Sequence, residues 1–376
     1  MPILRRCWAE IDLAAVEHNL TEYRKLLTGG TELMCVVKAA CYGHDDRLIV
    51  PFLQEKMGVR WFAVSNLDEA ERLREMGVTS EILILGYTPP ECAKRLAAGD
   101  IIQACTELSY AEELSRSGEG VRLHAAIDTG MTRIGLHGST EEICAELRAI
   151  ASLDCVRLEG IFTHYSSADG VTEADEEYTK MQTERFFKVK DMAERQGLKL
   201  EQAHIMNSAG GAYRTTDRST LARLGIILYG LYPDPKKPLP FKPEPVMTLK
   251  AVISQVKEIP AGTAVSYGRT YVSERAVRLA TVTAGYADGY PRALSNKGEV
   301  KVHGVRCPIA GRVCMDQFMC DVSAVPDALV GDEVILMDKE LDADEIAGLT
   351  GTIGYEITCG ISSRVPRIEA GSLEQG

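Results

Sequence analysis

A lysine stands at the end of a short apolar run near the start of the chain. Lys38 directly follows the run at 33–37, whose length and composition are typical of a strand buried on both faces of a parallel sheet. An amine at the C-terminal end of such a strand can form a Schiff base, hold a phosphate or pair with a carboxylate. Position alone leaves these three kinds of chemistry open.

Three other polar side chains also lie beside predicted strands, and each has an ordinary structural alternative. Arg223 lies just before the apolar run at 225–229, although most arginines are exposed or ion-paired. His164 follows another apolar run, where a single histidine is more often a core residue with satisfied hydrogen bonds. Tyr267 could equally be an ordinary tyrosine at the end of a strand.

Metal and dinucleotide chemistry find little support in the sequence. His124 and His204 fall on predicted strands and His164 follows one, but no spacing resembles a metal-ligand set such as HExxH, and strand histidines are more often structural. The segment 285–289 lacks the GxGxxG spacing of a dinucleotide-binding loop. We therefore expect no metal and no NAD.

The first two thirds of the chain alternate short apolar runs with longer amphipathic stretches, as expected for repeated βα units. The helical stretches include 66–76 and 173–195. About eight repeats in this length favour an α/β fold with a (β/α)8 TIM-type barrel over a doubly wound sheet. The predicted strands are 33–37, 61–64, 82–85, 101–104, 122–127, 157–162, 203–206 and 225–229.

A change of composition marks the end of this region. Six prolines lie between 233 and 245, which neither a helix nor a central strand can accommodate. Beyond them, alternating runs at 249–256, 278–283 and 333–337 predict a smaller, mainly β domain, with one short helix near 343–349. We place the two domains at 1–235 and 236–376.

Composition narrows the possible partners. The 42 basic residues are outnumbered by 54 acidic ones, a net charge of -12 that disfavours nucleic acid and anionic lipid surfaces. No apolar run reaches the length of a membrane helix. The 11 cysteines are odd in number and never form CxxC, and the N-terminus lacks a signal-peptide core. We expect a cytoplasmic protein with a small-molecule substrate.

The string Val-Val-Lys-Ala-Ala-Cys-Tyr-Gly-His at 36–44 resembles the cofactor-lysine motif of the alanine racemases, pyridoxal-phosphate (PLP) enzymes of fold-type III. Further blocks of that family follow in the family's order along nearly the whole chain. They lie at 128–135 (DTGMTRIG), 163–164 (TH), 207–208 (NS), 223–226 (RLGI), 267–268 (YG), 285–289 (GYADG), 311–317 (GRVCMDQ) and 364–367 (RVPR).

The resemblance implies a two-base racemase that interconverts L- and D-alanine. Lys38 would carry PLP and act as a base on one face of the substrate α-carbon. Tyr267, supplied by the β domain of a second copy, would act on the opposite face, so the active protein would be a homodimer with shared active sites. In the family, this chemistry supplies D-alanine for the bacterial cell wall.

The remaining roles also follow from the resemblance. Arg223 would hydrogen-bond the pyridine nitrogen and leave it unprotonated, and His164 would link Arg223 to the tyrosine base. Arg133 and the backbone N–H of Met315 would bind the substrate carboxylate. The expected phosphate ligands are Ser208, Gly225, Ile226, Tyr42 and Tyr355; Tyr355 and Tyr286 would also narrow the substrate entry, with Asp316 in support.

The chain departs from the family pattern at several positions. Ala126 stands where many members have a carbamylated lysine that holds the substrate-binding arginine, so another group must orient Arg133. Ala40, Cys41 and Asp45 replace the usual Asn, Ala and Gly, as in some serine or serine/alanine racemases. Serine is therefore an alternative substrate, although Tyr355, asparagine in some serine-preferring relatives, favours alanine.

Two further readings stay open at this point. The same barrel and β-domain plan resembles PLP-dependent decarboxylases, but these usually place an acidic residue at the pyridine nitrogen, where this chain has Arg223. A noncatalytic PLP-binding protein would resemble the barrel alone, which the second domain and Tyr267 disfavour.

Overall fold

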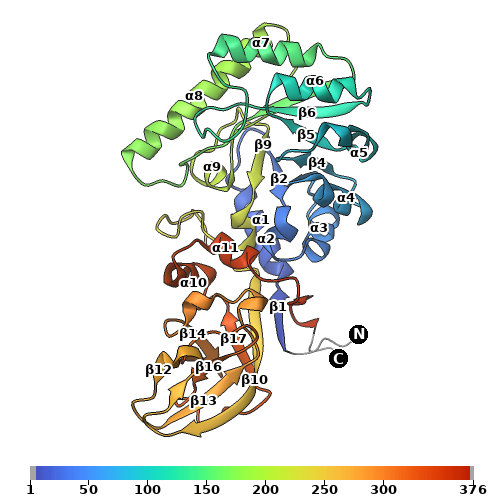
Figure 1. The fold of residues 1–376 in the computed structure, drawn as a ribbon. Helices are drawn as coiled ribbons and strands as arrows, with labels where there is room; N and C mark the ends of the chain where they lie inside the picture. The colour runs from blue at the N-terminus through green and yellow to red at the C-terminus, as the bar shows by residue number, and fades with distance from the viewer. Residues whose placement is uncertain (1–5, 373–376) are drawn as a thin grey trace.

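The computed structural model describes residues 6–372, and Figure 1 shows a helix-covered barrel joined to a smaller domain of strands. The N-terminal residues 1–5, part of the argument against a signal peptide, lie outside the described range. Among residues 6–372 no helix is long and apolar enough to cross a membrane.

Eight parallel strands form the barrel, in the order β8-β7-β6-β5-β4-β3-β2-β9. A parallel bridge between Met206 and Ala222 joins the two ends of this sheet and closes it. The predicted (β/α)8 architecture is thereby confirmed. The strands are β2 (Glu32–Val36), β3 (Trp61–Val64), β4 (Glu81–Ile84), β5 (Ile102–Cys105), β6 (Val121–Ala126), β7 (Val156–Phe162), β8 (Gln202–His204) and β9 (Leu221–Leu224).

One predicted strand is wrong. The run at 225–229 is not the last barrel strand, because Ile226–Tyr229 forms a short 3-10 helix, η2, and β9 precedes it. The run looked strand-like because it is wholly apolar, whereas the true strand is interrupted by Arg223. Arg223 therefore lies within a strand, and its side chain is buried in the barrel interior.

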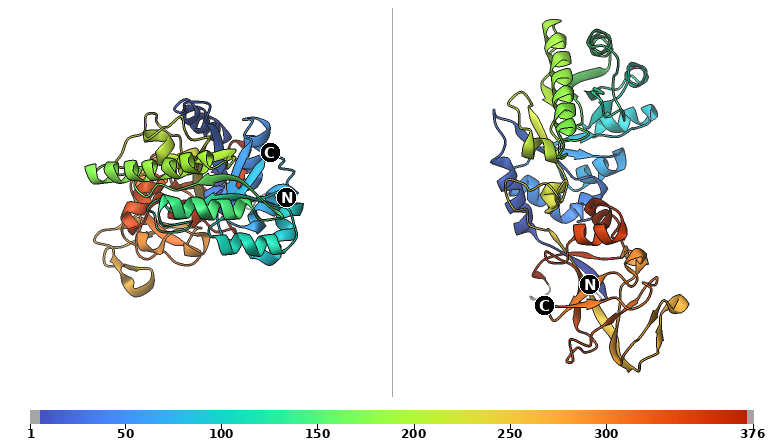
Figure 2. Two further views of the ribbon diagram at one scale, coloured as in Figure 1. Left: turned by 90° about the horizontal axis from the view of Figure 1, so that it is seen from above. Right: turned by 90° about the vertical axis from the view of Figure 1, so that its left-hand side faces the viewer.

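The longer barrel helices pack on the outer face of the strands, and Figure 2 shows the long α8 along one side. The predicted helix at 173–195 is confirmed as α8, and Thr172 and Asp175 form a capping box at its start. The predicted helix at 66–76 is also confirmed as α4, with Asn66 as its N-cap. The helices are α1 (Leu13–Arg24), α2 (Lys38–Tyr42), α3 (Asp46–Glu55), α4 (Leu67–Glu75), α5 (Ala93–Ala98), α6 (Leu108–Arg116), α7 (Thr140–Ala151), α8 (Glu173–Arg195) and α9 (Ser208–Tyr213).

The second domain is built on a mainly antiparallel sheet whose long central strand is β10 (Met247–Ile259). Strand β1 (Cys7–Ile11) pairs with β10 and β18, so the first strand of the chain lies in this sheet, although the predicted boundary is at 235. The other strands of this sheet are β13 (Val277–Val282), β14 (Glu299–Val302), β15 (Val305–Pro308), β16 (Phe318–Asp321), β17 (Glu333–Met337) and β18 (Arg367–Glu369). Strands β11 (Ala264–Val265) and β12 (Tyr271–Val272) form a separate pair.

Two short helices of the second domain, α10 (Ala343–Thr350) and α11 (Gly354–Cys359), lie at the junction with the barrel (Figure 1). Helix α11 contacts α2, which begins at Lys38. The β domain thus reaches the C-terminal end of its own barrel through α11.

Candidate active site

A cavity of about 580 Å³ opens at the C-terminal ends of the barrel strands. It is where a TIM-type barrel keeps its active site. Nine predicted site residues line it: Lys38, Tyr42, Arg133, His164, Ser208, Arg223, Gly225, Ile226 and Tyr355.

Lys38 begins a turn with an uncommon backbone. The residues from Ala39 to Tyr42 all have positive φ, between 49° and 58°, so the chain makes a short left-handed helical turn. None of them is glycine, and an L-residue in this region costs roughly 1–2 kcal/mol. Such a turn persists only where its surroundings determine it.

Several contacts hold this turn. The ring Nδ1 of His44 donates to the carbonyls of Cys41 and Tyr42, at 2.9 and 3.1 Å. Gly43 (φ +86°) lies so close to α11 that a Cβ would come within 2.1 Å of the Thr358 carbonyl oxygen. Tyr229 stacks on His44, with ring centroids 4.8 Å apart.

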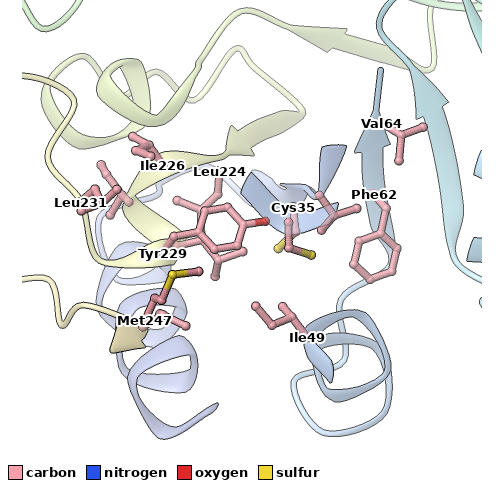
Figure 3. Packing of buried hydrophobic residues seen from close by; sticks show 14 of the residues in the cluster. Cys35, Ile49, Phe62, Val64, Leu224, Ile226, Tyr229, Leu231 and Met247 are labelled. Carbon is pink, nitrogen blue, oxygen red and sulfur yellow. The ribbon is translucent and has the colours of Figure 1, made fainter. Parts of the chain in front are cut away.

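Tyr229 also ties the turn to the barrel. Its hydroxyl donates to the carbonyl of Val36 at 2.8 Å, at the end of the strand that carries Lys38. Figure 3 shows the ring packed between Leu224 and Cys35, on the apolar side of the two adjoining strands β9 and β2. The lysine is thus fixed from both the strand side and the turn side.

The surroundings of Lys38 favour a neutral amine, chiefly through burial. Burial lowers the pKa of Lys38, and the nearby Arg133 guanidinium lowers it further, while Glu69 acts in the opposite sense. A neutral amine is the form that attacks a carbonyl carbon. The cavity therefore promotes the reactive form of this lysine.

Arg223 is held by its two terminal nitrogens. One donates to Nδ1 of His204 at 2.7 Å, and the other donates to the carbonyl of Thr163 at 2.6 Å and to Nδ1 of His164 at 3.2 Å. Only 2% of Arg223 is exposed. Burial lowers its pKa to about 10, so the guanidinium is still charged at neutral pH.

Behind Arg223 lies a pair of buried histidines. Since arginine only donates, the Nδ1 of His204 must accept, and the donor assignment then places the ring proton on Nε2. That Nε2 lies 3.0 Å from Nδ1 of His124. Burial lowers the pKa of both rings, to about 3 for His124. Two neutral histidines therefore support one buried cation.

Hydroxyl groups and a close backbone also converge at the cavity wall. The backbone N–H of Gly225 donates to Oγ of Ser208 at 2.8 Å, and a Cβ on Gly225 would come within 2.8 Å of the Tyr42 hydroxyl. Burial raises the pKa of Tyr42 and of Tyr355, so both phenols stay protonated donors. This cradle suits a phosphate.

Arg133 projects from a loop organised by Asp128, whose Oδ1 accepts from the N–H groups of Gly130 and Thr132 at 2.9 and 3.0 Å. Within residues 6–372 the Arg133 side chain forms no ion pair. Ala126 packs instead among apolar neighbours, including Phe162. No described residue forms the contact with the Arg133 side chain that the resemblance would assign to a lysine at position 126.

The remaining predicted residues lie on the β domain and do not line the cavity. Tyr267 is 70% exposed, in the short turn η3 (Tyr267–Arg269), and Met315 and Tyr286 are also exposed. The backbone of Tyr286 bonds to that of Cys314, and the side chain of Asp316 pairs with Arg364 at 2.9 Å. They form an exposed surface, which we call the Tyr267 surface.

Sequence reasoning missed two residues that contact this machinery. His204 was treated as structural, although it is the direct partner of Arg223. Glu69 was not singled out, yet it accepts a hydrogen bond from the backbone of Ala39. A carboxylate in the first turn of a helix gives no signal of its own, because such residues are common there. No group of three or more potential metal ligands occurs in the described residues.

Comparison with known proteins agrees with this geometry. The family model described as "Alanine racemase, N-terminal domain" matches residues 11–233, and the one described as "Alanine racemase, C-terminal domain" matches residues 246–369. The chain belongs to the alanine racemase family. The two matched segments leave the proline-rich connection between them.

Individual members of the alanine racemase family are similar over nearly the full length. The alanine racemase of Desulfovibrio desulfuricans is 44% identical, covering 97% of this chain and 98% of its own, and one from Clostridium perfringens is 42% identical, covering 97% and 95%. The structure of alanine racemase from Bacillus anthracis with bound L-Ala-P has a TM-score of 0.91 at 34% identity, covering 99% of this chain and 97% of its own.

Proposed function

We propose that this protein is a PLP-dependent racemase that interconverts L-alanine and D-alanine. The observation that carries the proposal is the cavity itself, which is lined by a half-buried lysine on a constrained turn, two arginines and a hydroxyl cradle. Full-length similarity to proteins named alanine racemase supports alanine over serine as the substrate.

The donors of the cavity fit PLP. Lys38 would hold it covalently, Arg223 would meet the ring nitrogen, and the phosphate would lie in a cradle of Tyr42, Ser208, Gly225, Ile226 and Tyr355. When bound, PLP supplies an electron sink for the carbanion that forms when the α-proton leaves. Because Arg223 keeps its own proton, it would moderate that sink and favour return of the proton over other reactions.

Two bases are needed to exchange a proton between opposite faces of one carbon. Lys38 would remove or return the proton on one face, and Tyr267 of the partner subunit would do so on the other. His164 would join the tyrosine to Arg223. This assignment explains why Tyr267 is exposed and outside the cavity of its own chain, and it requires a homodimer, with a barrel of 1–235 facing a β domain of 236–376.

Substrate binding would also combine both subunits. Arg133 would pair with the substrate carboxylate, which in turn would orient this otherwise unpaired guanidinium. The backbone N–H of Met315 would complete the clamp, with Asp316 supporting its loop. Tyr355 and Tyr286 would narrow the entry to a small side chain.

The setting we propose is the cytoplasm, where the product would serve bacterial cell-wall synthesis. All eleven cysteines are unpaired, as expected of a reducing compartment. The high acidic charge suits a small-molecule substrate rather than nucleic acid.

The test is turnover of L-alanine and L-serine by the purified protein with PLP in heavy water, followed by chiral separation. We expect D-alanine to form faster than D-serine and to carry deuterium at the α-carbon. Lys38→Ala should abolish both. Faster D-serine would overturn the substrate, and no exchange with either amino acid would overturn the racemase.

A further inference from the structure

The carboxylate of Glu69 connects two strand ends that border the cavity. Its Oε1 accepts from the backbone N–H of Ala39 at 2.7 Å, and its Oε2 accepts from the backbone N–H of Ser65 at 2.7 Å. Ala39 is the residue after Lys38, and Ser65 follows β3 and lines the cavity. One side chain therefore links the lysine turn to the neighbouring strand.

The position of Glu69 in its own helix makes this link unusual. Its backbone N–H donates to the side-chain Oδ1 of Asn66, the N-cap of α4, at 2.9 Å. A glutamate at this third position would ordinarily reach back to the N-cap backbone and complete a capping box. Here the two carboxylate oxygens accept from the backbone of Ser65 and Ala39 instead, and the bond to Ala39 connects the helix to the left-handed turn.

We propose that Glu69 is a positioning residue that holds the turn of Lys38 in its left-handed form and so aims the lysine amine into the cavity. The inference rests on the proposed function, because it assigns a consequence to the covalent role of Lys38. Ala39 is the first of the four consecutive non-glycine residues with positive φ. A charged acceptor on its N–H fixes the turn where it begins, beside the lysine Cα.

Glu69 also contributes charge, and the two contributions can be separated. The groups that act on the Lys38 amine are Arg133, Glu69 and Cys359. A purely electrostatic role of Glu69 would change only the pH at which the amine becomes neutral. A positioning role would change the rate even when every lysine is neutral.

The experiment measures the reaction of PLP with the full chain after its cofactor has been removed. In this step the neutral Lys38 amine attacks the aldehyde carbon of PLP, a C=N bond forms and water leaves. The rate constant is followed by absorbance from pH 6 to 10, and the product is confirmed by borohydride reduction and mass spectrometry. No turnover of amino acid is involved.

Three substitutions separate the roles. Glu69→Ala removes both acceptors, and we expect the high-pH plateau to fall about a hundredfold, while Glu69→Gln, with one acceptor left, should fall about tenfold. Glu69→Asp keeps the charge but is too short to reach both N–H groups, so its plateau should also fall. Asp68→Asn, on the same helix and 90% exposed at its side chain, is the matched control and should react as the wild type does.

The outcomes decide between the possibilities. Wild-type plateaus for Glu69→Gln and Glu69→Asp, with thermal stability unchanged, would overturn the positioning role. Failure of the unsubstituted protein to form the covalent link at Lys38 would instead overturn the proposed function. Normal melting of Glu69→Gln verifies that the change is local.

Discussion

The end of the barrel and the Tyr267 surface are the two places where the predicted chemistry lies, and they are built differently. In the barrel, Arg223 is 2% exposed and each terminal nitrogen of its guanidinium has an acceptor. On the β domain, Tyr267 is 70% exposed and Met315 53%. The first region is organised within one chain, whereas the second presents large apolar side chains to its surroundings.

The difference indicates that the two regions would serve different parts of the proposed function. Buried, fully bonded groups are suited to holding a cofactor in one orientation, because their geometry does not depend on another molecule. Exposed aromatic and methionine side chains, clustered on one face, are typical of a surface that is covered in an assembly. A chain with only the first region complete would bind a cofactor but lack its second base.

The largest expected effect tests this division directly. Lys38→Ala and Tyr267→Phe proteins should each lose turnover by about a thousandfold, since each would lack one of the two proposed proton-transfer groups. When the two variants are unfolded together and refolded, half of the dimers are mixed. A mixed dimer has one site with both bases, so the mixture should regain about a quarter of wild-type activity.

The control is the same mixing with Lys38→Ala alone, which should regain nothing. If both bases belonged to one chain, the mixture of the two variants would stay as inactive as either parent. Cofactor absorbance should be normal in Tyr267→Phe, because Tyr267 does not line the cavity of its own chain.

A second effect contrasts the buried histidine of the lysine turn with an exposed one. Burial lowers the pKa of His44 to about 4, below the 6.5 of an unfolded chain. Between these values the folded state binds fewer protons than the unfolded state, so His44 withdraws about 3 kcal/mol of stability as the pH falls from 6.5 to 4. Above pH 6.5 His44 is neutral in both the folded and the unfolded state, so this loss of stability is absent.

The measurement is urea unfolding of the cofactor-free protein at pH 7 and pH 4.5. His44→Phe should be less stable at pH 7, because the carbonyls of Cys41 and Tyr42 lose their donor, but it should lose less on acidification. His137→Phe, at an exposed position, should leave the difference between the two pH values unchanged. An equal acid loss in His44→Phe and wild type would contradict the assignment.

Much of the barrel could be predicted from the sequence, because strands buried on both faces leave uninterrupted apolar runs and capped helices leave polar signals. The strand prediction failed where an inward-facing polar residue interrupted the apolar run, as Arg223 does in β9. It also could not place β1, since five residues do not record whether their partner strand lies near or more than two hundred positions away.

The candidate site was predictable to the extent that residue type carries chemistry. Lys38 was found by its position at a strand end, whereas the roles expected of Arg223 and His164 came from the family resemblance. The left-handed turn was not, because its Ala-Ala-Cys-Tyr sequence contains no glycine and its conformation depends on distant groups such as His44 and Glu69. Long-range hydrogen bonds to backbone groups leave no local pattern.

The smallest expected effect concerns Tyr355, a β-domain residue that, unlike Tyr267, reaches the cavity of its own barrel. Its ring lies 6.2 Å from that of Tyr42, and burial raises the pKa of its phenol. Tyr355→Asn should raise the ratio of serine to alanine racemisation by about tenfold, since a buried amide gains a partner in the serine hydroxyl.

Tyr355→Phe removes the hydroxyl but keeps the ring, so it should weaken PLP binding without changing that ratio. Competition between the two substrates in one reaction measures the ratio, and an unchanged value in Tyr355→Asn would show that this side chain does not select the substrate. The β domain would then act on its own barrel only through cofactor binding, and selectivity would depend on the Tyr267 surface of the partner.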